Sequence, residues 1–210
     1  MGKPEAKIEN YLISRAIRNG YSHYKFQALG NRGVPDQILI GQGRVLFVEC
    51  KAEGKNVIPG SKQDLTIQDM RQRGADVRVV NAQDQIDSIF KEPILRLVPP
   101  VWIQDMNTRH HDGTLEHTVE HTFLKQAKKT GFLAYKFRAI GRRGVPDRLL
   151  IGHNAVYFVE LKAPGENLRE LQKVVTDNMR TAGAIVLVMN TEQACYEFFS
   201  HFAACFYSII

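Results

Sequence analysis

The sequence contains the same unit twice, and this duplication constrains the fold more than any other feature. Residues 9–52 align without a gap with residues 120–163, with identity in 13 of the first 28 pairs and in 9 of the following 16. After two extra residues in the first copy, the alignment continues and Gln63 falls opposite Gln172. The fold therefore has to be built from two similar units.

The segment between the copies has the composition of a linker. It contains Pro93, the pair Pro99-Pro100 and a polar run over residues 107–113, and such clusters mark connecting chain rather than a packed element. We therefore predict a first domain over residues 1–91, a linker over 92–115 and a second domain over 116–210.

Hydrophobic periodicity predicts the same series of elements in both copies. Each copy begins with apolar residues at helical spacing, continues with three short segments rich in β-branched and aromatic residues, and ends in a helix, a strand and a helix. The prediction is an α/β fold. The predicted elements after the opening helices are strands 24–27, 37–40 and 45–50, helix 62–73, strand 77–80 and helix 83–90, with helix 168–181, strand 185–189 and helix 192–206 near the end of the second copy.

Composition narrows the class of protein. With 44% hydrophobic residues the chain has enough apolar material to fold, and its net charge of +6 favours a polyanionic partner without requiring one. Three widely spaced cysteines, Cys50, Cys195 and Cys205, suit a reducing compartment and give neither a disulfide framework nor a zinc motif. No segment reaches the roughly 20 apolar residues of a membrane span, so we expect a cytoplasmic protein that binds no membrane.

One group of charged residues in the first copy has the pattern of an active site. Asp36 ends the run Gly-Val-Pro-Asp, and Glu49, Cys50 and Lys51 follow thirteen residues later at the end of an apolar strand. Alternate side chains of a strand share a face, so Glu49 and Lys51 point the same way, about 7 Å apart, and Cys50 points to the other face. If the two strands between them form a hairpin, Asp36 lies near Glu49.

The second copy repeats this pattern with Asp147, Glu160, Leu161 and Lys162. Two carboxylates and the carbonyl of the residue between Glu and Lys form an incomplete coordination sphere that suits Mg²⁺. Such an ion activates water and stabilises the charge of a phosphate undergoing attack, and the lysine is placed to assist.

Two further pairs of polar residues are expected near these groups. Glu9 and Glu120 lie on the apolar stripe of the opening helices, so their carboxylates point inward. Gln63 and Gln172 lie on the helix after the Glu-x-Lys strand, where an amide is able to position a water or a phosphate oxygen. Taken singly, such residues are more often turn residues, surface ion pairs or helix-terminal charges. Their combination at the end of an apolar strand favours a site.

At these residues each copy resembles the VRR-NUC domain of the PD-(D/E)xK nuclease superfamily. The resemblance rests on the opening-helix Glu, the Gly-x-Pro-Asp, the Glu-x-Lys and the later Gln, and it covers about residues 5–90 and 116–200. It implies a restriction-endonuclease-like core and Mg²⁺- or Mn²⁺-dependent hydrolysis of DNA. The implied metal ligands are Asp36, Glu49 and the Cys50 carbonyl, with Asp147, Glu160 and the Leu161 carbonyl in the second copy. The implied catalytic lysines are Lys51 and Lys162, with Glu9, Glu120, Gln63 and Gln172 in support.

Basic residues cluster around the two Pro-Asp turns. In a nuclease they are placed to neutralise DNA phosphates without reading sequence, and the alternative is a solvated basic loop. The candidate DNA-binding residues are Lys25, Arg32, Lys136, Arg138, Arg142, Arg143 and Arg148.

The resemblance also implies a substrate. Solitary VRR-NUC proteins resemble dimeric enzymes that cut branched DNA, in particular four-way (Holliday) junctions, and a covalent tandem supplies the same pair of sites as an intramolecular pseudo-dimer. We therefore predict a metal-dependent endonuclease for branched DNA in the cytoplasm of a bacterium or a phage-infected cell, with further homo-oligomerisation left open. Two alternatives remain: a non-catalytic DNA-binding or assembly module on the nuclease fold, and a sequence-specific restriction-type endonuclease.

Overall fold

The computed structural model describes residues 5–93 and 115–203. Within these ranges no helix combines the length and the apolar character that a membrane span requires. The predicted linker lies outside the described residues except for its ends, Glu92, Pro93 and Leu115, and so do Cys205 and the end of the last predicted helix. Cys50 and Cys195 are buried free thiols.

The first unit follows the predicted order of elements, with bounds that differ by a few residues at most. It consists of α1 (Ala6–Arg18), β1 (Ser22–Ala28), β2 (Gln37–Gly41), β3 (Arg44–Cys50), α2 (Lys62–Gln72), β4 (Asp76–Val80) and α3 (Gln83–Ile89).

The second unit repeats this order. It consists of α4 (Glu116–Lys129), β5 (Leu133–Ala139), β6 (Arg148–Gly152), β7 (Ala155–Leu161), α5 (Glu170–Thr181), β8 (Ile185–Met189) and α6 (Glu192–Ala203). Helix α5 begins two residues later than the pattern predicts because Arg169 is extended and serves as its N-cap. The Arg169 amide donates a hydrogen bond to Gln172 Oε1 at 3.0 Å, which satisfies one of the backbone donors at this helix end.

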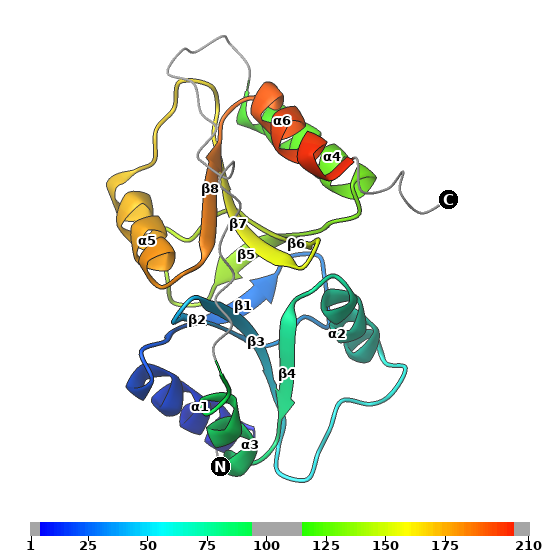
Figure 1. Ribbon diagram of the computed structural model, residues 1–210, viewed down its shortest axis with the longest axis vertical. Helices are drawn as coiled ribbons and strands as arrows, with labels where there is room; N and C mark the ends of the chain where they lie inside the picture. The colour runs from blue at the N-terminus through cyan, green and yellow to red at the C-terminus, as the bar shows by residue number, and fades with distance from the viewer. Residues whose placement is uncertain (1–4, 94–114, 204–210) are drawn as a thin grey trace.

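All eight strands belong to one sheet, in the order β4-β3-β2-β1-β5-β6-β7-β8. In each unit the first three strands form an antiparallel meander and the last strand is parallel to the third. In Figure 1 the first unit fills the lower half of the view and the second unit the upper half. Helices α1 and α3 appear at the lower left of the view, and α4 and α6 at the upper right. The α/β class is thus confirmed.

The strands β1 and β5 join the two units in a symmetric register. Gln27 pairs with Arg138, and these two residues occupy equivalent positions in the two copies. The flanking pairs, Phe26 with Ala139 and Ala28 with Phe137, exchange equivalent residues in the same way. The joint therefore has the register of a two-fold axis that passes between Gln27 and Arg138.

The largest hydrophobic core draws on both units. Helices α2 and α5 cover one face of the sheet, where Phe26 and Phe137 lie with ring centroids 5.7 Å apart. On the other face, α1 with α3 and α4 with α6 cover separate clusters over the outer strands of each unit. Each unit thus has its own core on one face, and both share a core on the other.

A second contact between the units lies at their turns. The Gly43 amide donates to the Ala182 carbonyl at 3.1 Å, and the Asn154 amide donates to the Arg73 carbonyl at the same distance. These are equivalent contacts, since Gly43 corresponds to Asn154 and Arg73 to Ala182. The two-fold pattern of the sheet thus extends to the loops.

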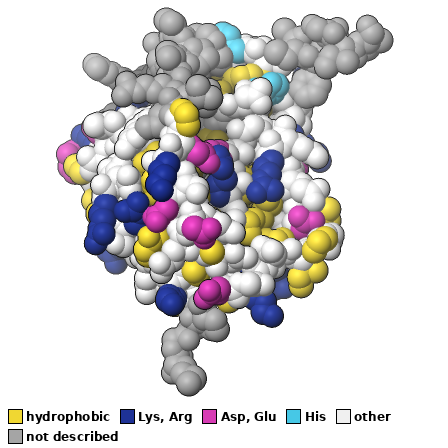
Figure 2. Space-filling model, turned by 60° about the horizontal axis from the view of Figure 1, so that its bottom comes forward, with side chains coloured by type: hydrophobic (Ala, Val, Ile, Leu, Met, Phe, Trp, Pro, Cys, Tyr) yellow, Lys and Arg dark blue, Asp and Glu magenta, His cyan; other side chains and the backbone are white. Residues whose placement is uncertain are grey.

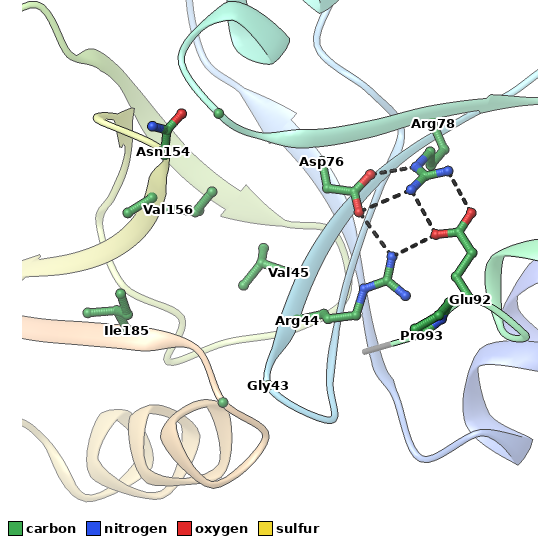
Figure 3. Close-up of a pocket in the computed structure, with 13 residues that line it drawn as sticks. Gly43, Arg44, Val45, Asp76, Arg78, Glu92, Pro93, Asn154, Val156 and Ile185 are labelled. Carbon is green, nitrogen blue, oxygen red and sulfur yellow. Dashed lines mark hydrogen bonds and ion pairs between the residues drawn. The ribbon is translucent and has the colours of Figure 1, made fainter. Parts of the chain in front are cut away.

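A cavity of about 370 Å³ opens beside this contact. Figure 3 shows apolar side chains of both units, Val45, Val156 and Ile185, on one side of it. On the other side Arg44 and Arg78 form ion pairs with Asp76 and Glu92, at N–O distances of 2.5–3.1 Å. Arg44 begins β3, so the cavity lies at the opposite end of that strand from Glu49.

Candidate active sites

The β2–β3 hairpin brings Asp36 to Glu49. Gln37, the first residue of β2, pairs with Val48 of β3, so the residue before Gln37 lies beside the residue after Val48. Consistent with this register, Asp36 lies close enough to Glu49 to raise the pKa of the Glu49 carboxyl group. The hairpin expected from the sequence is therefore formed, and it joins the two halves of the motif.

Glu49 and Lys51 share a face of β3, as the strand pattern predicts. Lys51 Nζ lies 2.6 Å from Glu49 Oε1, and the glutamate side chain is 2% exposed. Cys50 points to the other face, into the core beneath α1. A buried carboxylate and an ammonium group are thus held together at the end of an apolar strand.

The second unit has the same arrangement. Lys162 Nζ contacts Glu160 Oε1 and donates to the Leu161 carbonyl oxygen at 3.2 Å. The Leu161 amide in turn donates to Asp147 Oδ2 at 3.3 Å. Both carboxylates, the lysine and the carbonyl between them therefore meet at the end of β7.

The two glutamines on the following helices reach these clusters. Gln172 Nε2 donates to Glu160 Oε1, and Gln63 lies near enough to Glu49 to lower the pKa of that carboxyl group. Helix α2 comes this close because Gly33 of the Pro-Asp turn has no side chain: a Cβ there would lie 2.9 Å from the Gln63 Cα. The two extra residues before α2 lie in a largely exposed loop and do not displace Gln63.

The opening-helix glutamates are partly buried but held differently in the two units. Glu9 Oε1 accepts hydrogen bonds from Lys25 Nζ at 2.6 Å and from Gln37 Nε2 at 2.7 Å. Glu120 Oε1 instead accepts from the guanidinium group of Arg148, with the Nε at 3.0 Å and a second, shorter contact from a terminal nitrogen. Glu9 also lies near enough to Asp36 to raise its pKa.

Burial determines the electrostatics of both clusters. Desolvation raises the pKa of Asp36 and of Glu49, and it is only partly opposed by the attraction of Lys25 for Asp36 and by the hydrogen bond from Lys51 to Glu49. In the second cluster burial, with the nearby Asp147 charge, raises the pKa of Glu160 to about 7, against the hydrogen bond from Lys162. The two carboxylates of each cluster outnumber its single lysine, and burial disfavours their charged form unless a further cation binds.

These residues fit a divalent cation. One oxygen of each buried glutamate, Glu49 Oε2 and Glu160 Oε2, has no hydrogen-bond partner, and an unpartnered buried carboxylate oxygen is costly unless a cation binds it. Within residues 5–93 and 115–203 no group of three or more His, Cys, Asp or Glu side chains is arranged around one point. The donors fit an ion such as Mg²⁺ that takes two carboxylates and a carbonyl and keeps waters.

Four polar side chains form an exposed strip over the joint between the units. Lys25 and Gln27 alternate with buried residues on β1, and Lys136 and Arg138 do so on β5. Because Gln27 pairs with Arg138, all four point to the same face of the sheet. We call these four residues the central strip. Lys25 connects it to the first cluster, since its charge lowers the pKa of Asp36 against the effect of burial.

The other predicted DNA-binding residues divide into two groups. Arg32, Arg142 and Arg143 are exposed on the Pro-Asp turns, and the Arg142 guanidinium lies 4.8 Å from the centre of the Tyr24 ring. Arg148 differs from the prediction of an exposed basic residue. It is 9% exposed and paired with Glu120, because it begins a strand whose alternate residues point beneath α4.

Two acidic residues near the clusters were missed by the sequence analysis. Glu5, just before α1, and Glu116, at the start of α4, occupy equivalent positions. The charge of Glu5 raises the pKa of Asp36 and of Lys51. Burial raises the pKa of Glu116, which Lys162 lowers and Asp147 raises further. Extending the internal alignment four residues toward the N-terminus would have paired them.

Comparison with known proteins identifies the family. No protein-family model matches the sequence. One relative, "Putative nuclease p44" of Acyrthosiphon pisum secondary endosymbiont phage 1, is 37% identical over 78 residues, which cover 37% of this chain and 84% of the relative. The chain belongs to the same family as this phage protein. A solved structure described as "VRR_NUC domain" is 30% identical, with 97% of it and 43% of this chain covered and a TM-score of 0.40. Each match covers about the length of one of the two units.

Proposed function

We propose that this protein is a divalent-metal-dependent DNA endonuclease that hydrolyses phosphodiester bonds in branched DNA, in particular in four-way junctions. The observation that carries the proposal is the presence of two equivalent carboxylate–lysine clusters on one continuous sheet, with a symmetric joint between them. The nuclease activity is supported by the shared family and the name of the phage relative, and by the VRR-NUC-like pattern of residues in both units.

Asp36, Glu49 and the Cys50 carbonyl would hold the cation in the first unit, and Asp147, Glu160 and the Leu161 carbonyl in the second. When bound, Mg²⁺ or Mn²⁺ supplies an activated water and stabilises charge on the phosphate. The unpartnered glutamate oxygens and the surplus negative charge of both clusters support this assignment.

The side chains around the clusters have separate tasks in this mechanism. Burial disfavours the charged form of Lys51, but the hydrogen bond and attraction of Glu49 outweigh this effect and raise its pKa. Lys51 therefore remains an ammonium group that stabilises negative charge on the phosphate and orients the attacking water. Gln63 lies beside Glu49 and presents an amide to that carboxylate. Lys162 and Gln172 have the same tasks in the second unit.

The central strip would bind DNA at the joint between the two units. Lys25, Lys136 and Arg138 offer three positive charges to phosphates, without base recognition. On the face shown in Figure 2, basic side chains are interspersed with acidic ones, so this face has no continuous basic patch. A local basic strip on the joint between two sites favours a substrate whose branch point lies at the joint. In this proposal the chain acts as an intramolecular pseudo-dimer.

The first test is cleavage of a set of DNA substrates of shared sequence. With Mg²⁺ or Mn²⁺, the wild-type protein is expected to cut a four-way junction at least about tenfold faster than a linear duplex, because only the junction engages both sites. A flapped duplex is expected to lie between them, and EDTA to stop all cleavage. End-labelled strands resolved on denaturing gels measure the rates. Absence of cleavage on every substrate would indicate a non-catalytic binding module, and cleavage of one linear sequence alone would indicate a restriction-type enzyme.

A second prediction concerns the central strip. Arg138→Gln, which places at this position the residue of the first copy, is expected to weaken binding to a four-way junction by about three- to tenfold near physiological salt. It should also reduce the slope of log Kd against log salt by about one, because one phosphate contact is lost. Fluorescence anisotropy in Ca²⁺ measures both.

The matched control for Arg138→Gln is Lys91→Gln. Lys91 is exposed and adjoins Glu92, which pairs with Arg44 at the far end of β3 from Glu49. The Lys91→Gln replacement removes one positive charge at a place away from the strip. An equal loss of DNA affinity in both variants would therefore contradict a specific role for the strip.

A further inference from the structure

The two clusters are matched at most of their charged and amide positions, and this makes a difference in charge between them informative. Seven pairs of equivalent residues have the same type in both units. These pairs are Glu5 and Glu116, Glu9 and Glu120, Lys25 and Lys136, Asp36 and Asp147, Glu49 and Glu160, Lys51 and Lys162, and Gln63 and Gln172. The residue after the Pro-Asp breaks this pattern, since it is Gln37 in the first unit and Arg148 in the second.

Both residues have the same structural role but differ in charge. Gln37 is fully buried and its amide donates to Glu9. Arg148 is nearly buried and its guanidinium donates to Glu120. Each therefore fixes the opening-helix glutamate from the first position of its strand. The seven matched pairs and this position together carry a formal charge of −2 in the first unit and −1 in the second.

The extra positive charge belongs to a residue that adjoins the second cluster in the chain. Arg148 directly follows Asp147 and pairs with Val159, the neighbour of Glu160, so its side chain points to the face of the sheet opposite to that of Glu160. Because its side chain is buried and held by Glu120, water screens its charge less than that of an exposed lysine. Although Glu120 pairs with it, Arg148 adds one positive charge that the first unit lacks at this position, and this added charge opposes the binding of a divalent cation.

The change in pairing also affects the lysine of the strip. In the first unit Lys25 is bound to Glu9, whereas in the second unit Arg148 takes this place and the equivalent Lys136 is exposed on β5. The second cluster thus has both a fixed buried cation and an exposed lysine. Glu166 adds a negative charge near Glu116, but it is exposed and its effect is weakened by solvent.

We propose that Arg148 makes the second cluster the weaker of two inequivalent metal sites, so that the first site binds Mn²⁺ or Mg²⁺ at lower concentration. This inference rests on the proposed metal-dependent function, and it adds that the first site binds its metal ion before the second. One unit charge in a partly buried site corresponds to a difference in affinity of about tenfold or more. At limiting metal, the strand at the first site is then cut before the strand at the second.

The test measures metal binding to each site separately. Asp147→Asn leaves the first site, Asp36→Asn leaves the second, and Mn²⁺ binding to each full-length variant is followed by electron paramagnetic resonance of the free ion. We expect the Asp147→Asn protein to bind Mn²⁺ about tenfold more tightly than the Asp36→Asn protein.

The residue exchange between the copies supplies the decisive variants. Adding Arg148→Gln to Asp36→Asn is expected to bring the second site to within about twofold of the first, and adding Gln37→Arg to Asp147→Asn to weaken the first site by about tenfold. Both replacements place at one copy the residue found in the other, and circular dichroism and thermal melting check that each variant is folded. Equal Mn²⁺ affinities in the two single variants, no effect of Arg148→Gln, or no Mn²⁺ binding at either site would each overturn the inference.

Failure of this inference is distinguishable from failure of the proposed function. If the wild-type protein cuts junctions with Mn²⁺ but its sites bind the ion equally, the function stands and the inference falls. If the affinities differ as expected but no DNA is cut, the inference stands and the nuclease proposal falls.

Discussion

Replacing both Lys51 and Lys162 by alanine is expected to reduce DNA cleavage by about 10³-fold or more, while each single replacement converts paired cutting of a junction into a nick in one strand. The loss is large because a charge aimed at the reacting phosphate in a buried site has a greater effect there than it has in water. Each lysine contacts its own glutamate, Glu49 or Glu160, and does not reach the other cluster. The two sites are therefore expected to fail independently.

Strand-specific labels on a four-way junction measure this prediction, since they distinguish a nick from a paired cut. The control is Lys55→Ala, which removes an exposed lysine four residues after Lys51, and it is expected to leave both cuts intact. Junction binding in Ca²⁺ shows whether the double variant still binds DNA. Full cleavage by the double variant would exclude both lysines from catalysis, and loss of both cuts in a single variant would mean that one unit carries the chemistry for both strands.

Much of each cluster follows from local rules that the sequence displays. Period-two alternation places Glu49 and Lys51 on one face, and the short turn before Arg44 forces β2 and β3 into a hairpin. These two facts suffice to bring Asp36 to Glu49. Gln63 also follows, because the helix after the strand packs back on the sheet whatever the length of the exposed loop before it.

The features that the sequence did not reveal depend on tertiary packing. From its charge alone, Arg148 was predicted to contact DNA. In the structure it is buried beneath α4 and forms an ion pair with Glu120. The pairing of β1 with β5 is equally invisible, because either strand would satisfy local rules as a free edge. Exposed edges invite pairing with another chain, and here each unit covers the edge of the other. The duplication predicted two units, and only the register of Gln27 with Arg138 reveals how they join.

The contact between the turns of the two units has the largest expected effect on stability. Gly183 has a φ of +99°, and a Cβ at this position would lie 2.3 Å from the Cα and 2.7 Å from the nitrogen of Gly43. Both are backbone atoms, so the turn of the first unit has to move away and the hydrogen bond from Gly43 to Ala182 is lost. We expect Gly183→Ala to lower the free energy of unfolding by roughly 2–4 kcal/mol.

The control variant is Gly141→Ala, which measures the cost of placing a side chain at a positive φ without disturbing the contact between the units. Gly141 has a φ of +76° but open space around its Cβ position, so its replacement is expected to cost only about 1 kcal/mol. Chemical denaturation of both variants measures the difference. Because the turn contact helps to fix the two sites relative to each other, Gly183→Ala is also expected to yield more single nicks per paired cut of a junction, whereas Gly141→Ala leaves this ratio unchanged. Equal destabilisation by the two variants would mean that the turns do not hold the units together, and the β1–β5 joint alone would then set the spacing of the two cuts.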